Sequence, residues 1–180
     1  MTAASMMLVA VVGSAASGCW GSGTPVRSGD PVRLGQVAFE VPAGWHRTDT
    51  HQPGALISMW VPDVETNPRK ESITVIQGDA VGPPLDERRL EKLVSGAQIA
   101  LGSAKTSKVT AVTTEAGLTG YQIEVEFTPQ NVKERYRRTH VVLRDHGRLV
   151  HVIYTARSPD PERDGLETVL STLRHEEVAS

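Results

Sequence analysis

The side chains of this sequence that are best suited to chemistry are its six histidines. His46 and His51 lie in a segment rich in turn-forming residues, whereas His140, His146 and His151 fall on and around one predicted hairpin. An imidazole can transfer a proton near neutral pH or bind a metal ion. The sequence contains no Gly-x-Ser-x-Gly, phosphate-binding glycine loop or His-Glu-x-x-His motif, so the histidines are interpreted as solvated or packing residues.

The register of the hairpin around Asp145-His146-Gly147 decides whether His140 and His151 can act together. A three-residue loop with Gly147 left-handed places the two histidines on opposite faces of the sheet. A two-residue turn, His146-Gly147, places them diagonally on one face. We favour the three-residue loop because it does not demand a positive φ from His146, and we therefore predict no metal site and no cofactor.

Three arginines form a predicted basic edge that faces acidic residues of a neighbouring strand. The arginines are Arg135, Arg137 and Arg138, and the acidic residues are Glu124 and Glu126. Cross-strand pairs of opposite charge contribute about 0.2–1 kcal/mol each, so a structural role explains them. The alternative is a contact patch for an anionic lipid headgroup or an acidic partner.

Two tryptophans, Trp45 and Trp60, are further candidates for a binding surface. Both are predicted to anchor the core or a turn, and a ligand platform is the alternative. The carboxylates Asp63 and Glu65 lie in a predicted surface loop, and we interpret them as solubility charges rather than as an acid and base pair.

The periodicity of apolar residues predicts three strands, a helix, four strands and a helix. The alternation is clearest after Gly120, where Tyr121, Ile123 and Val125 alternate with polar residues. The predicted strands cover residues 37–42, 56–61, 72–76, 109–113, 121–128, 135–145 and 148–156.

Two amphipathic helices complete this pattern. The first follows Asp86 as N-cap and ends before Gly102, and the second has Asp160 as N-cap and Pro161 in its first position. Strands joined by short turns are antiparallel, and amphipathic helices need a sheet face to cover. We therefore predict an α/β (α+β) fold, with a central, largely antiparallel sheet of about six to seven strands covered by helices on both faces.

The single cysteine, Cys19, ends an apolar run of small residues. Ala16-Ser17-Gly18-Cys19 resembles the cleavage box of exported bacterial lipoproteins. This resemblance implies a signal peptide over residues 1–18, palmitate-type acyl chains on Cys19 and a flexible tether over residues 19–35. It predicts a protein anchored to a lipid bilayer in the bacterial cell envelope, facing the periplasm or the cell exterior.

The folded part, residues 36–175 before a tail at 176–180, resembles the PsbP-like domains, including the DcrB-like lipoproteins. The likeness lies in Phe39-Glu40-Val41-Pro42-Ala43-Gly44-Trp45, in Gly120-Tyr121, and in the hairpin from Asp145-His146-Gly147 to Ala156. These motifs are structural. Family members act mostly as accessory or binding proteins, so the resemblance implies no enzymatic activity.

These features together predict a non-enzymatic binding or accessory lipoprotein. Its partner is expected to be another envelope protein or a small ligand; the net charge of −2 argues against nucleic acid. The residues considered for binding are Trp45, His46, His51, Trp60, Arg135, Arg137 and Arg138. The alternatives are a small hydrolase with an unrecognised His/carboxylate site, using His46 or His51, and a chaperone-like subunit of an envelope assembly.

Overall fold

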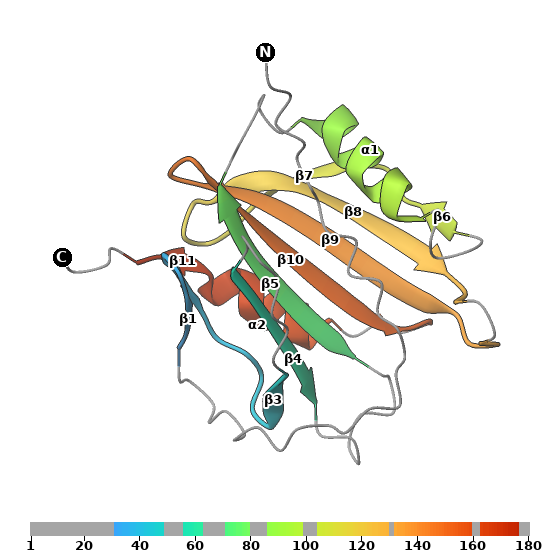
Figure 1. The fold of residues 1–180 in the computed structure, drawn as a ribbon, viewed down its shortest axis with the longest axis horizontal. Coiled ribbons are helices and arrows are strands. Elements are labelled where there is room, and N and C mark those ends of the chain that lie inside the picture. Colours follow the sequence, from blue (N-terminus) through green and yellow to red (C-terminus); the bar gives the residue numbers. More distant parts are fainter. Residues whose placement is uncertain are drawn as a thin grey trace.

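The computed structural model of the chain describes residues 31–48, 56–62, 71–79, 86–98, 104–129, 132–159 and 163–176 (Figure 1). An eight-stranded sheet, antiparallel in every pair, forms the centre of this part. Its strands are, in spatial order, β3 (Trp45–Thr48), β4 (Leu56–Pro62), β5 (Ser72–Asp79), β10 (Arg148–Arg157), β9 (Tyr136–Asp145), β8 (Thr119–Phe127) and β6 (Ala104–Thr106), with β7 (Thr110–Thr113) also paired to β8.

A second, three-stranded sheet and two short helices accompany the large sheet. The small sheet has the order β1 (Val32–Leu34), β2 (Val37–Phe39), β11 (Arg174–His175), and the helices are α1 (Glu87–Gln98) and α2 (Asp164–Thr172). Figure 1 shows α1 alongside β8, and α2 near the small sheet. None of the described helices is long and apolar enough to span a bilayer.

The predicted α/β fold, a sheet covered by helices on both faces, is wrong. Strands dominate the described residues, and the helices have only 12 and 9 residues. Neither helix is long enough to form a layer over eight strands, and α2 shares its face with the small sheet. The error arose because β1, β6 and β11 have two or three residues each, too few to show an alternating pattern.

The alternation of side chains along β9 divides the core into two clusters. Val141 and Leu143 pack with Leu166 and Val169 of α2 on one face, here called the α2 face. Val142 points to the other face, here called the α1 face, where it belongs to the cluster that includes Leu90 of α1. Because successive side chains of a strand point to opposite faces, β9 is apolar on both.

Six of the seven predicted strands are confirmed within a few residues in the large sheet, and so is the cap of α1. The other, predicted over 37–42, is shorter and forms β2 of the small sheet. The backbone N–H of Arg89 donates to Asp86 Oδ1 at 2.8 Å, as expected of an N-cap. Helix α2 begins later than predicted, at Asp164, without a side-chain cap. Arg163 instead pairs with Glu124 of β8 at 2.7 Å, which ties the start of α2 to the sheet.

Several sequence predictions fall outside the described residues. They are the signal peptide, Cys19 and most of the tether, together with His51, Asp63, Glu65, Gly102, Asp160, Pro161 and the C-terminal tail from residue 177. They stay predictions, except that Asp160 and Pro161 are not the N-cap and first residue of α2, which begins at Asp164 after Arg163.

Candidate metal centre

The turn between β9 and β10 has two residues, so the predicted three-residue loop is wrong. Asp145 pairs with Arg148, and both turn residues have positive φ, 42° at His146 and 82° at Gly147. These are the signs of a type I′ turn, whose twist matches that of the flanking strands. The unusual φ of His146 is compensated by its side chain, whose Nδ1 lies 2.8 Å from Asp145 Oδ1.

This register brings His140 and His151 to the same face, which also corrects the prediction of opposite faces. His151 pairs with Val142, diagonal to His140, and His140 Nδ1 lies 3.0 Å from His151 Nε2. Burial lowers the pKa of His140 well below its usual value, with further contributions from His151 and from the positive charge of Arg138. Burial and the positive charge of Arg138 lower the pKa of His151 to about 4, so both imidazoles are neutral at pH 7.

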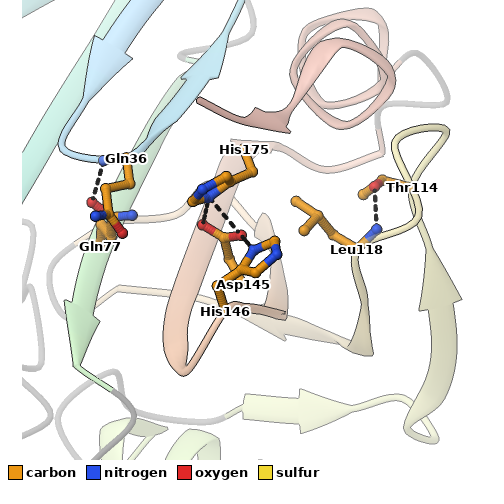
Figure 2. A network of polar contacts seen from close by, with 7 residues as sticks. All are labelled: Gln36, Gln77, Thr114, Leu118, Asp145, His146 and His175. Atoms are coloured by element: carbon orange, nitrogen blue, oxygen red, sulfur yellow. Dashed lines mark hydrogen bonds and ion pairs between the residues drawn. The ribbon is translucent and has the colours of Figure 1, made fainter. Parts of the chain in front are cut away.

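A second group of imidazoles converges on Asp145, at the tip of the hairpin (Figure 2). The Asp145 carboxylate is buried, with its residue 1% exposed. His175 Nδ1 lies 3.0 Å from both carboxylate oxygens, and the His146 and His175 rings are 4.3 Å apart between centroids. We call Asp145, His146 and His175 the carboxylate–histidine cluster.

The cluster is assembled by three separate elements. Asp145 ends β9 and His146 opens the turn, whereas His175 belongs to β11 in the small sheet. His175 is positioned by the pairing of β11 with β2, where it lies opposite Val37. The cluster therefore joins the large sheet to the small one.

The three side chains carry ligands that a transition-metal ion accepts. Each offers one ligand atom, and these atoms lie within 4.8 Å of one another. Zn²⁺ binds imidazole nitrogen and carboxylate oxygen at about 2.0–2.2 Å, which separates tetrahedral ligands by about 3.3 Å. The closest N···O distances, 2.8 and 3.0 Å, need to increase by only a few tenths of an ångström, with the ion replacing the hydrogen-bonding protons. The widest separation, up to 4.8 Å, has to shorten, which the exposed His146 side chain allows.

Sequence reasoning missed this cluster. The adjacent Asp145 and His146 at a turn were a visible signal, but His175 is thirty positions from Asp145 and lies in a two-residue strand. Nothing in the local pattern around His175 indicates that it lies next to the hairpin.

The two tryptophans singled out from the sequence are both buried in the α2-face core. Trp45 is 5% exposed and Trp60 is 4% exposed. The Nε1–H of Trp60 donates to Ser58 Oγ at 2.7 Å, which satisfies its polar atom inside the protein. This placement favours the core-anchor interpretation over a ligand platform.

The other predicted binding residues are not gathered into one site. His46 is half-buried in edge strand β3, which three other strands separate from β9. Arg135 is exposed, and Arg137 pairs with Glu126 at 3.0 Å, the cross-strand contact expected from the sequence. Arg138 points to the opposite face from Arg137, so the three arginines do not form one continuous basic surface.

The chain matches no protein-family model and no curated protein. The resemblance to PsbP-like domains therefore stays a prediction. What the protein binds has to be argued from the geometry of its own residues.

Proposed function

We propose that this chain is a lipid-anchored, non-enzymatic binding protein of a bacterial cell envelope, and that its carboxylate–histidine cluster binds a divalent transition-metal ion. One observation carries the metal proposal: two imidazole nitrogens lie within 3.0 Å of one buried carboxylate. The lipoprotein cleavage box before Cys19 and the PsbP-like sequence motifs support the anchored, accessory role.

The ligand set selects the kind of ion. Imidazole suits Zn²⁺, Cu²⁺ and Ni²⁺, whereas Ca²⁺ takes six to eight oxygens and Mg²⁺ keeps several of its waters. The buried Asp145 supplies the negative charge that offsets part of the charge of the ion. The His146 side chain is 72% exposed, so an ion can reach the cluster from solvent by way of the turn.

Metal binding is expected to stabilise the fold, because it links the hairpin tip to β11. We expect Zn²⁺ at about 100 times its dissociation constant to stabilise the chelator-treated protein by about 2.7 kcal/mol, raising Tm by about 5–10 °C. His146→Ala removes an exposed ligand and is expected to weaken zinc binding by more than about 100-fold, beyond the effect of losing an outer-shell partner. Differential scanning calorimetry and zinc titration measure both effects.

The matched control is His46→Ala, which removes an imidazole from edge strand β3, far from the cluster in strand order. It should keep the Tm increase with zinc. An equal increase in the His146→Ala protein would contradict the proposal, and so would a wild-type chain that shows none.

The anchoring part of the proposal is tested separately. Cys19→Ser removes the thiol that accepts the lipid, so we expect the full chain expressed in bacteria to stop sedimenting with membrane vesicles. The acyl chains contribute about 0.8 kcal/mol for each buried methylene, which is why losing them has a large effect. A Cys19→Ser protein that sediments like the wild type would refute the lipid anchor without touching the metal proposal.

Hydrolysis is the second candidate function, since three protein ligands leave a coordination position for water, as in catalytic zinc sites. Among the described residues, neither imidazole of the cluster hydrogen-bonds to a Ser, Thr or Cys side chain, so the nucleophile would have to be the metal-bound water. We expect the zinc-loaded protein to hydrolyse activated esters no faster than its His146→Ala variant; a faster rate would favour the enzyme. For a chaperone-like subunit there is little support, because Leu56 is the one exposed large apolar side chain in the described part.

A further inference from the structure

The two imidazole pairs of the β9–β10 hairpin have neighbours of opposite charge. The cluster on the α2 face surrounds the carboxylate of Asp145. The pair His140–His151 on the α1 face lies beside the guanidinium of Arg138, whose positive charge lowers the pKa of both histidines. A negative neighbour favours a cation and a positive neighbour favours an anion, so the second pair is unsuited to a metal ion.

The contacts that Arg138 makes in the described part of the chain are with neutral groups. Arg138 lies on the same face as His140, opposite Thr155 of β10, and its Nε–H donates to Thr155 Oγ1 at 3.0 Å. Its guanidinium carbon also lies 5.1 Å from the centre of the Phe127 ring. A guanidinium has five N–H donors, and the hydroxyl engages one of them.

No carboxylate among the residues that the structure describes forms an ion pair with Arg138. Its sequence neighbour Arg137 differs, because it points to the other face and pairs with Glu126. Burial lowers the pKa of Arg138, whose residue is half-buried, so its charge has lost part of its hydration. Such a charge is costly in a folded protein unless an anion compensates it.

The histidine pair beside Arg138 adds hydrogen-bonding groups to this region but no charge. Ile123 of β8 lies opposite His140 and Ile76 of β5 lies opposite His151, so both neighbouring strands present apolar side chains to the pair. One imidazole donates to the other in the 3.0 Å contact, which leaves the neutral pair one further N–H donor and one further acceptor.

We infer that Arg138, His140, His151 and Thr155 form a second site, which binds a small oxyanion, a carboxylate or a phosphate group. The guanidinium fork supplies two parallel N–H donors to the oxyanion, the geometry that makes arginine the preferred partner of both groups. The remaining N–H of the histidine pair and the Thr155 hydroxyl are the neutral donors. The site is independent of the metal proposal, since it uses none of the residues of the carboxylate–histidine cluster.

The test titrates the metal-free full chain with inorganic phosphate and, in a separate arm, with acetate. Ionic strength is held constant with sodium chloride, because salt screens charge interactions at exposed sites. We expect saturable binding of at least one anion. In NMR spectra we expect the ring signals of His140 and His151 to shift while those of His146 and His175 stay in place. The arm that saturates identifies the group that the site prefers.

Variants of the arginine make the test specific. Arg138→Met keeps the length of the side chain but removes its charge and its forked donors, and we expect it to weaken anion binding at least about tenfold. Arg138→Lys keeps the charge, so its affinity for the anion should lie between those of the wild type and Arg138→Met. Arg135→Met removes an exposed arginine next to the same strand, and its affinity for the anion should stay within about twofold of the wild-type value. Binding undiminished in Arg138→Met overturns the inference. So does a wild-type chain in which neither anion shifts the signals of His140 and His151, a result that does not depend on the variants folding.

Discussion

Acidification from pH 7 to pH 4 is expected to destabilise the metal-free chain, because the unfolded state binds protons at His140 and His151 that the folded state resists. Both histidines have folded pKa values below the usual 6.5. The contribution of these histidines to the free energy of unfolding is therefore greatest above pH 6.5 and decreases as the pH falls below 6.5. With a folded pKa of about 4, His151 alone accounts for about 3 kcal/mol at pH 4, an upper value because its half-buried ring is partly screened by solvent.

Urea unfolding at several pH values in the presence of a chelator measures this effect. The double variant His140→Gln/His151→Gln keeps polar groups that can hydrogen-bond to each other but cannot take up a proton. It should lose most of the pH dependence between pH 6.5 and pH 4. His46→Gln, on edge strand β3, should keep it. Equal wild-type stability at pH 7 and pH 4.5 would show that the buried pair does not resist protonation.

Gly120→Ala is expected to destabilise the protein by at least about 4 kcal/mol, the range reached only when a specific structural requirement is broken. A β carbon at Gly120 would lie 1.9 Å from the carbonyl oxygen of Val142 and 2.9 Å from Leu143 Cα. Both are backbone atoms of β9, which is hydrogen-bonded on its other side to β10. The strand cannot move away without breaking the central pairing of the sheet.

Gly78→Ala is the matched control, because Gly78 also lies in a strand of the large sheet but has nothing within 4 Å of its added β carbon. We expect it to change the free energy of unfolding by less than about 1 kcal/mol, with slight stabilisation because alanine restricts the unfolded chain. Chemical denaturation measures the free energy of unfolding of both variants and tests this difference. Similar losses in both would mean that the close approach of β8 and β9 is not what requires Gly120.

The carboxylate–histidine cluster shows why sequence reasoning found a turn but not the side chains that gather at it. Asp145 and His146 are visible as a hairpin turn, because Asp-His-Gly is turn-forming and is flanked by apolar strands. The exact turn depends on a one-residue choice, and a shift of one residue moves every side chain to the other face. A positive φ is unfavourable for an isolated histidine, but His146 contacts both Asp145 and His175, and the contact with His175 is not visible in the local sequence.

The sequence by itself determined the long strands, the hairpin and the cap of α1, because these depend on apolar alternation and on contacts within four residues. Its cysteine motif also predicts a membrane anchor, outside the described residues. Only the tertiary structure decided the small sheet, the position of His175 and the separation of Arg137 from Arg138 onto faces with different partners. The physical reason is the separation of the contacts along the sequence. Pairing β2 with β11 joins residues more than 130 positions apart, and no local pattern encodes that contact.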